Sequence, residues 1–246
     1  MQILDNVYMV GSGNIGLSNT YDCHVYLIDG GNHELALVDA GVGLESNRIF
    51  GNIRAHNFDP KNIVYVLTTH SHSDHAGGCR NLKAETSCGI IASEAEARLM
   101  EKGTDEELGL IIAKKSGCYP LDYAYPHCQV DKTIRDQETL RVGNCQVRAI
   151  CVPGHSVGST CYLLEQDNHR VLFSGDTVLF NGIIGLLNCY GSSLEAYREN
   201  MGKLSNLGID ALMPGHGLFT VRGGQAHIDK AVEALQELFV PQCMGP

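Results

Sequence analysis

Three imidazoles and one carboxylate lie within six residues of this chain, in the stretch Thr69-His70-Ser71-His72-Ser73-Asp74-His75-Ala76-Gly77-Gly78. The stretch directly follows the apolar run Ile63-Val64-Tyr65-Val66-Leu67, which predicts a buried strand. Divalent metals of borderline softness bind imidazole nitrogen and carboxylate oxygen, and an i, i+2 pair on an extended segment can direct His70 and His72 to one ion. A single histidine is usually an ordinary residue, but three in so short a stretch favour a metal site at the end of a strand.

The pattern His-x-His-x-Asp-His resembles the signature of the metallo-β-lactamase superfamily, whose members complete the metal site with three isolated residues further along the chain. Matching residues occur here in the same order: His155 in Val-Pro-Gly-His-Ser, Asp176 in Phe-Ser-Gly-Asp-Thr and His216 in Met-Pro-Gly-His-Gly. The resemblance implies a first metal held by His70, His72 and His155. It implies a second metal held by Asp74, His75 and His216, with Asp176 bridging the two.

This resemblance also implies the fold, which is an α+β fold of the four-layered αβ/βα sandwich type. Strands and helices are expected twice along the chain, with ligands delivered at strand ends in both halves. Because the motifs of one site run from residue 70 to residue 216, we expect residues 1–246 to form a single metallo-β-lactamase-like domain.

Periodicity and turn residues predict the individual elements. In the first half we expect a strand over residues 2–10, an antiparallel pair over 21–40, a helix over 44–56, a strand over 63–67, a helix opened by a Ser93–Glu96 capping box and a helix over 106–115. In the second half we expect strands within 138–165, over 171–173 and over 209–213, a helix capped at 192–195 and an amphipathic helix over 225–239.

The segment Gly11-Ser12-Gly13-Asn14-Ile15-Gly16 formally matches the dinucleotide-binding fingerprint. A dinucleotide-binding glycine loop must open a helix that receives the pyrophosphate, whereas this chain continues into a predicted strand. We therefore expect a hairpin loop that borders the metal cleft, and no nucleotide site.

A tyrosine-rich segment covers residues 119–125 and contains three tyrosines. Two interpretations stay open, a packed surface loop and a substrate-facing flap, because loops on rigid scaffolds commonly carry recognition. His127, just beyond this segment, is not expected to bind metal. Asp39, at the end of a predicted strand, is a candidate partner for the ring N–H of a metal-binding histidine.

Charge and cysteine content restrict partners and compartment. The formal net charge of −10 repels phosphate backbones, so we expect a small-molecule substrate and no nucleic acid. The ten cysteines never occur as Cys-x-x-Cys, which argues against a zinc ribbon or a thioredoxin-like site. The first residues lack a signal-peptide pattern and no apolar run has the length of a membrane span, so we expect a cytoplasmic protein without membrane association. The sequence leaves the oligomeric state open.

The resemblance implies a hydrolase with two divalent metal ions, taken as Zn²⁺ with Fe or Mn as alternatives. Two such ions lower the pKa of a shared water from 15.7 towards about 7, so that a bridging hydroxide can attack an ester, thioester or lactone carbonyl. Asp74 is the expected catalytic residue, because it can orient the hydroxide or accept its proton.

The filled ligand set looks like the glyoxalase II and lactonase branches, although the sequence departs from both. About thirty residues follow His216, with Arg222 and Lys230 as their only Arg or Lys, whereas glyoxalase II adds a helical domain with basic residues. Acyl-homoserine lactonases carry a tyrosine where this chain has Leu179, and Tyr190 is a candidate substitute.

Other activities stay open. β-Lactamase or phosphodiesterase activity is one alternative; the β-lactamases fit less well because Asp176 is present. Persulfide dioxygenases resemble this pattern but use one iron, at positions matching His70, His155 and Asp176, in a two-His, one-carboxylate arrangement. A binding module that has lost activity is a third alternative, which the complete ligand set disfavours.

Overall fold

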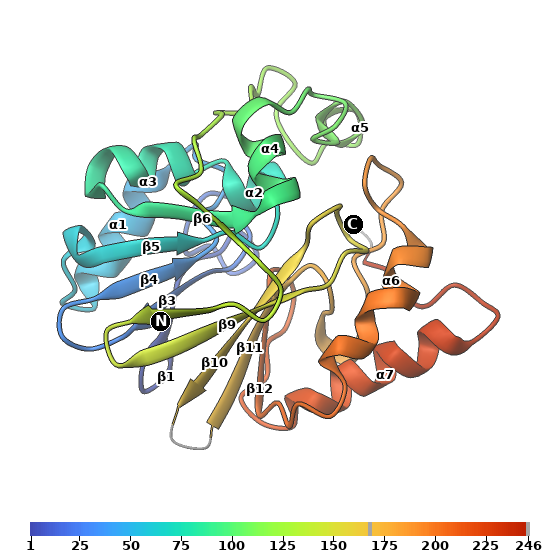
Figure 1. Cartoon of the computed structure of the whole chain (residues 1–246). Helices are drawn as coiled ribbons and strands as arrows, with labels where there is room; N and C mark the ends of the chain where they lie inside the picture. Colours follow the sequence, from blue (N-terminus) through green and yellow to red (C-terminus); the bar gives the residue numbers. More distant parts are fainter. Residues whose placement is uncertain (167–168, 245–246) are drawn as a thin grey trace. The chain divides into compact units, whose positions relative to one another are not determined.

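The computed structural model describes residues 1–166 and 169–244 (Figure 1). The chain folds into two compact units. The first unit comprises residues 1–133 and 142–144, and the second comprises residues 134–141 and the chain from Cys145 onward. The prediction that residues 1–246 form a single domain depends on how these two units are joined, and it stays a prediction.

The first unit is built on a seven-stranded sheet with the strand order β1-β2-β3-β4-β5-β6-β7. Its strands are β1 (Gln2–Leu4), β2 (Val7–Gly11), β3 (Val25–Asp29), β4 (Leu35–Val38), β5 (Ile63–Leu67), β6 (Gly89–Ser93) and β7 (Lys132–Ile134). Strands β1 to β4 pair antiparallel, whereas β4, β5 and β6 pair in parallel. The carboxyl ends of these parallel strands therefore meet at one edge of the sheet.

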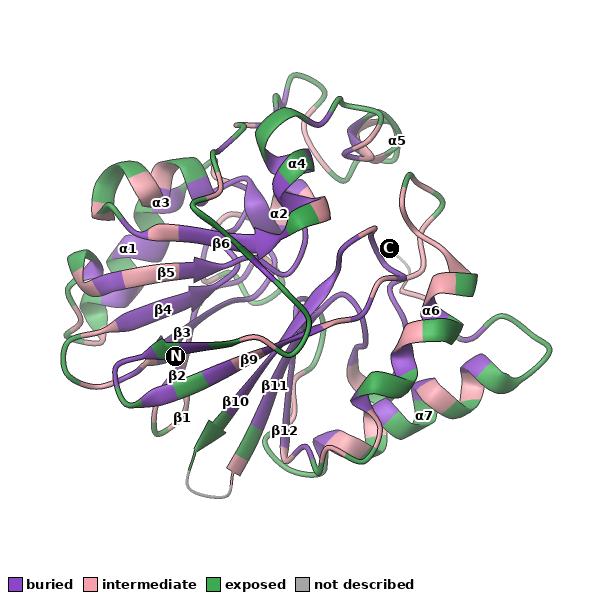
Figure 2. Ribbon diagram, viewed as in Figure 1, coloured by how far each residue is buried: buried purple, intermediate pink, exposed green. Residues whose placement is uncertain are grey.

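Six helical segments accompany this sheet: α1 (Ser46–Ala55), η1 (Pro60–Asn62), α2 (Ser73–Ala76), α3 (Cys79–Thr86), α4 (Glu94–Lys102) and α5 (Leu110–Lys115). Helix α1 lies within the predicted range 44–56, packs against β2 and buries Ile49, Phe50 and Ile53. Helices α3 and α4 both pack against β6. Figure 2 shows the result, with mostly buried strands and helices exposed along their outer sides.

The amino-terminal prediction was partly wrong. Residues 2–10 form two antiparallel strands, β1 and β2, because Asp5 and Asn6 make a turn between them. Residues 12–24, all of which the structure describes, form neither helix nor strand, so the predicted pair begins only at Val25. The glycine-rich loop opens no helix there, whereas a dinucleotide-binding glycine loop would open one.

The second unit carries a five-stranded sheet with the order β12-β11-β10-β9-β8. Its strands are β8 (Thr139–Val142), β9 (Cys145–Cys151), β10 (Thr160–Gln166), β11 (His169–Gly175) and β12 (Ala211–Pro214). Strands β9, β10 and β11 pair antiparallel, and β11 pairs with β12 in parallel. The carboxyl ends of β11 and β12 therefore lie side by side.

Helices pack on this sheet and share one hydrophobic core with it. They are η2 (Phe180–Gly182), α6 (Leu194–Asn200), η3 (Met201–Leu204) and α7 (Gly224–Gln236), and α6 and α7 contact each other (Figure 1). Tyr197 from α6 and Ile228 from α7 are fully buried in one cluster with Leu163 of β10. Ser193 caps α6 as predicted, since its Oγ accepts the N–H of Ala196 at 3.2 Å.

The last helix is shorter than predicted. Helix α7 ends at Gln236, and Leu238 and Phe239, which the prediction included in the helix, are 87% and 80% exposed. Glu237 leaves the helix with an extended ψ of 163°, and Pro241, which disfavours a helical conformation at Val240 and has no N–H, keeps the helix from resuming. Within residues 1–166 and 169–244, no helix combines the length and the apolar character needed to cross a bilayer.

Candidate metal centre

Strand β5 delivers the histidine-rich stretch of the first unit. After Leu67 the chain runs through His70 and His72 without regular secondary structure, then forms the helical turn α2, which carries Asp74 and His75. His70 and His75 are almost completely buried, and the ring centroids lie 4.6 Å apart for His70 and His72 and 4.0 Å apart for His70 and His75. One strand end and one helical turn thus bring these four side chains together.

A close approach of two backbone segments holds this turn in place. The N–H of Gly78 donates to the carbonyl of Gly41 at 2.8 Å, and a Cβ on Gly78 would lie 2.0 Å from the carbonyl oxygen of Ala40. Only glycine fits there without displacing the loop that follows β4. The turn is therefore locked against the segment that carries Asp39.

Asp39 organises the buried side of the histidine stretch. It follows β4, is 1% exposed and adopts a left-handed backbone conformation with φ of 63°. Its Oδ1 accepts the N–H of Thr69 at 2.8 Å, and its Oδ2 accepts the Thr69 hydroxyl at 2.8 Å. Its Oδ2 also lies 2.8 Å from Nδ1 of His75. The carboxylate therefore receives three donors from the metal-motif region.

These contacts settle which ring nitrogens carry protons. Nδ1 of His75 donates to the Asp39 carboxylate. The single hydroxyl proton of Thr69 goes to the same carboxylate, so the Thr69 oxygen must accept from Nδ1 of His70, which lies 3.0 Å away. Both imidazoles therefore present the lone pair of Nε2, the arrangement typical of metal-bound histidines.

Glu96 supports the backbone between His70 and His72. It lies in the first turn of α4, is fully buried, and its Oε2 accepts the N–H of Ser71 at 2.8 Å. The predicted cap is also present, because Oγ of Ser93 accepts the N–H of Glu96 at 3.4 Å. Sequence reasoning assigned Glu96 to the capping box and missed its contact with the histidine motif.

Asp74 contacts the tyrosine-rich segment. Its Oδ1 accepts the hydroxyl of Tyr119 at 2.5 Å, and the Tyr119 oxygen accepts the N–H of Asp74 at 3.3 Å. Burial and the neighbouring Asp74 carboxylate hold the pKa of Tyr119 well above its usual range, so Tyr119 is a protonated donor. His127, which was not expected to bind metal, is exposed, and its Nδ1 is hydrogen-bonded to the Met100 carbonyl.

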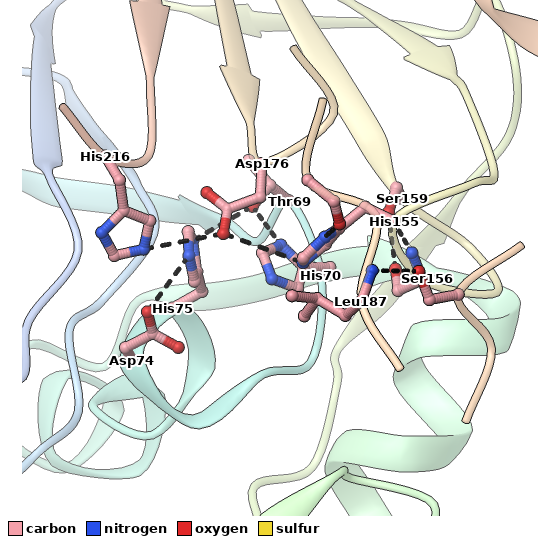
Figure 3. Close-up of polar contacts among 12 residues, drawn as sticks. Thr69, His70, Asp74, His75, His155, Ser156, Ser159, Asp176, Leu187 and His216 are labelled. Atoms are coloured by element: carbon pink, nitrogen blue, oxygen red, sulfur yellow. Dashed lines mark hydrogen bonds and ion pairs between the residues drawn. The ribbon is translucent and has the colours of Figure 1, made fainter. Parts of the chain in front are cut away.

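The second unit contributes the other three predicted ligands. His155 follows β9, Asp176 follows β11 and His216 follows β12 (Figure 3). Because β11 and β12 are parallel neighbours, Asp176 and His216 leave the sheet together, and Nε2 of His216 lies 3.6 Å from Oδ2 of Asp176. Nε2 of His155 lies 3.8 Å from the same oxygen. The structure therefore places the imidazoles of His155 and His216 close to one oxygen of the Asp176 carboxylate.

Gly185 fixes the orientation of His155. Its carbonyl oxygen lies 2.5 Å from Nδ1 of His155, so this nitrogen carries the proton and Nε2 is left as the donor to a metal. A Cβ on Gly185 would lie 2.7 Å from that Nδ1 and 2.2 Å from the Asp176 carbonyl oxygen. The preceding residue, Ile184, is fully buried in the core of the second unit.

The donor chemistry of both units fits divalent metal. The first unit offers three imidazoles and one carboxylate at its histidine stretch, and the second offers two imidazoles and one carboxylate. Nitrogen and oxygen donors of this kind suit zinc, iron or manganese. Three of the five imidazoles have their Nδ1 occupied by an oxygen, which leaves Nε2 for the ion.

A further set of metal-type side chains, Cys23, Asp39 and His75, has ligand atoms within 4.8 Å of one another. Burial raises the pKa of the Cys23 thiol far above its usual range, so the thiolate that a metal needs is disfavoured. Asp39 and Nδ1 of His75 are hydrogen-bonded to each other. In this set the Asp39–His75 hydrogen bond supports the histidine stretch.

Comparisons with known proteins point to one family. A family model described as the metallo-beta-lactamase superfamily matches residues 19–216. Two curated relatives come from Aspergillus fumigatus. The "Lactamase-like protein nscB" is 28% identical over 87% of this chain and 54% of its own length, and the "Atrochrysone carboxyl ACP thioesterase" is 29% identical over 86% of this chain and 56% of its own length. The chain thus spans about half the length of these relatives.

Solved structures agree on the fold. BJP-1, a subclass B3 metallo-beta-lactamase of Bradyrhizobium japonicum, has a TM-score of 0.73 and 25% identity, with 95% of this chain and 89% of that chain covered. A beta-lactamase from Chitinophaga pinensis, at 19% identity and a TM-score of 0.72, shows the same fold over 96% of this chain and 90% of its own. The predicted α+β class and metallo-β-lactamase fold are confirmed.

Proposed function

The chain belongs to the metallo-β-lactamase superfamily, and from this premise we propose that it is a metal-dependent hydrolase that cleaves a thioester. One observation carries the metal dependence: the Nδ1 atoms of His70, His75 and His155 are each paired with an oxygen, which fixes each ring in the tautomer whose Nε2 carries the lone pair that a metal needs. The choice of thioester is supported by the relative named as an ACP thioesterase, which is 29% identical over 213 residues.

The proposed ligand set follows the order of ligands in the family. One ion would be held by His70, His72 and His155, a second by Asp74, His75 and His216, and Asp176 would bridge them. Support within each unit comes from the grouping of the four first-unit side chains and from the 3.6 Å and 3.8 Å distances to Oδ2 of Asp176. Zinc is the proposed metal, with iron and manganese as alternatives.

Bound divalent ions lower the pKa of a coordinated water to about 7 and polarise the substrate carbonyl. Beyond holding the ions, the protein then needs to supply little further acid or base catalysis. A thiol has a pKa of about 8.5, so the sulfur of a thioester can leave as thiolate without a strong general acid. Asp74 supplies a carboxylate that can orient the attacking water or accept its proton, with Oδ2 at 3.5 Å from Nε2 of His75.

Thioester cleavage also agrees with the glyoxalase II and lactonase branch that the ligand pattern resembles, and lactones are the next substrate class to test. A second candidate activity, β-lactam hydrolysis, is favoured by the likeness to BJP-1, although that likeness is at 25% identity. A cytoplasmic location stays part of the proposal; it is supported by the ten cysteines, all of which are free thiols in the part of the chain that the structure describes.

A substrate panel tests the proposal. Protein purified without added metal is analysed for zinc, iron and manganese and assayed with acyl thioesters, lactones, a chromogenic β-lactam and phosphodiesters, and with a persulfide while oxygen uptake is recorded. We expect thioester cleavage that a chelator abolishes and zinc restores. Asp176→Ala should lose it, whereas Asp229→Ala, which changes an exposed carboxylate on α7, should retain it. One iron per chain with oxygen uptake on the persulfide would overturn the proposal.

A further inference from the structure

Tyr119 lies against the carboxylate that the metal site is proposed to use. We propose that Tyr119 is a positioning residue that holds Asp74 as a metal ligand through one oxygen, Oδ2. This inference rests on the proposed metal site and goes beyond it, because it ties the tyrosine-rich segment to the geometry of one ligand.

The contact between the two residues is reciprocal. The Tyr119 hydroxyl donates to Oδ1 of Asp74 at 2.5 Å, and the same oxygen accepts the backbone N–H of Asp74 at 3.3 Å. One hydroxyl therefore holds both the side chain and the main chain of Asp74. Two contacts at one residue restrict its χ angles far more than a single surface hydrogen bond would.

The ring of Tyr119 is itself held in place. It stacks on Tyr123 with centroids 5.5 Å apart and an interplanar angle of 24°, and it contacts Tyr21 with centroids 6.3 Å apart. Tyr123 is anchored in turn, since its hydroxyl donates to the Val42 carbonyl at 2.9 Å. Offset aromatic pairs of this kind fix ring position, so the Tyr119 hydroxyl is presented to Asp74 from a rigid support.

The two carboxylate oxygens of Asp74 consequently face different partners. Oδ1 accepts the Tyr119 hydroxyl, whereas Oδ2 lies 3.5 Å from Nε2 of His75, the ring nitrogen that carries the lone pair because Nδ1 donates to Asp39. A carboxylate held in this way offers its Oδ2 to an ion beside His75. Partners of this kind orient metal ligands, and their loss typically costs 10- to 100-fold in metal affinity.

The chain offers a matched pair of variants. Tyr119→Phe and Tyr123→Phe each remove one hydroxyl from the same aromatic stack; the Tyr119 hydroxyl donates to Asp74, whereas the Tyr123 hydroxyl donates to the Val42 carbonyl. Zinc affinity is measured for the full chain by competition with a chromophoric chelator, and the visible spectrum of the Co²⁺-substituted protein reports ligand geometry. Thermal unfolding of both variants checks the fold. Kinetic constants for the best thioester of the panel are recorded separately.

We expect Tyr119→Phe to weaken the binding of one of two ions about tenfold or more and to alter the Co²⁺ spectrum. Tyr123→Phe leaves the Tyr119 hydroxyl in place and should change both readouts far less than Tyr119→Phe does. Equal weakening in the two variants, or in neither, would overturn the positioning role. A wild-type protein that binds metal but cleaves no thioester would remove the proposed reaction and leave this metal readout intact, so the two failures are distinguishable.

A second measurement needs no variant at position 119. In the wild-type protein, the Tyr119 hydroxyl proton should exchange slowly with solvent and give a low-field NMR signal that shifts when Zn²⁺ is added, because the ion polarises the carboxylate that accepts it. A hydroxyl signal that does not respond to Zn²⁺ would contradict the inference even if Tyr119→Phe failed to fold.

Discussion

Nδ1 of His75 lies 2.8 Å from Oδ2 of Asp39, and both side chains are buried. Asp39 was a candidate partner for a histidine ring N–H, and this contact confirms that prediction. The pair joins the ends of two neighbouring parallel strands, since Asp39 follows β4 and the histidine stretch follows β5. A carboxylate behind an imidazole raises the basicity of the ring and fixes the nitrogen that faces the metal.

Asp39→Asn should weaken metal binding about 10- to 100-fold. The asparagine amide has one acceptor oxygen, whereas Asp39 receives donors from Thr69 and His75 on both oxygens. At least one donor is left facing an NH₂ group, so the free energy of unfolding should fall by about 1–3 kcal/mol. Chelator competition and urea unfolding measure the two effects. Asp59→Asn, which changes a cap at the other end of β5, is the control; equal metal affinities for both variants would contradict the account.

Gly185→Ala should disturb His155 and lower the stability of the second unit. The added Cβ would lie 2.2 Å from the Asp176 carbonyl oxygen, so the backbone that carries the contact to His155 must move. We expect a loss of about 1–3 kcal/mol in unfolding free energy and a clear loss of metal affinity. Gly202→Ala is the control, because a Cβ there meets nothing within 4 Å. If both alanine variants behave like the wild type, Gly185 does not position His155.

Glu96→Ala should weaken metal binding, whereas Glu96→Gln should largely retain it. The alanine variant removes the acceptor for the Ser71 N–H in a fully buried position, which costs about 1–3 kcal/mol, while the glutamine oxygen can still accept it. Thermal unfolding and zinc affinity are compared for the two variants. Identical losses in both would show that the negative charge of Glu96, and not its acceptor role, supports the motif.

The ion pair of Asp131 should make stability depend on pH. Burial acts to raise the pKa of Asp131, but the hydrogen bonds from Ile90 N–H and Lys83, with the Lys83 charge, outweigh it and lower the pKa. A carboxyl with a lowered pKa in the folded state stabilises the fold above its ordinary pKa of about 4, and this is lost as pH falls through the lowered value. Asp131→Asn should therefore cost about 0.2–1 kcal/mol at pH about 7 and less at pH about 3. Urea unfolding at both pH values checks this, and an equal cost at both would contradict it.

Much of the fold could be predicted from the sequence because the local patterns of apolar residues were strong. The apolar run before His70 is β5 with the predicted bounds, and the helix expected over 44–56 is α1, Ser46–Ala55. Errors occurred where a local rule interrupted a periodic pattern, at the turn of Asp5 and Asn6 and before Pro241. Periodicity counts apolar positions and gives little weight to such breaks.

The sequence named the candidate ligands and one supporting residue, Asp39, but none of the other supporting residues. Metal donors occur in a recognisable spacing, whereas Thr69, Glu96, Tyr119 and Gly185 act through contacts between residues up to 45 positions apart. No sequence signature marks a residue that positions a metal ligand through a hydroxyl, a cap carboxylate, a loop tyrosine or a glycine carbonyl. Only the structure assigns them to particular ligands.

The most direct test of the account is anomalous scattering at the zinc edge from crystals of the zinc-loaded protein. We predict two peaks, one bound by His70, His72 and His155, the other by Asp74, His75 and His216, with Asp176 between them. A single peak, or peaks that His155, Asp176 and His216 do not reach, would contradict the proposed binuclear site and the hydrolase built on it.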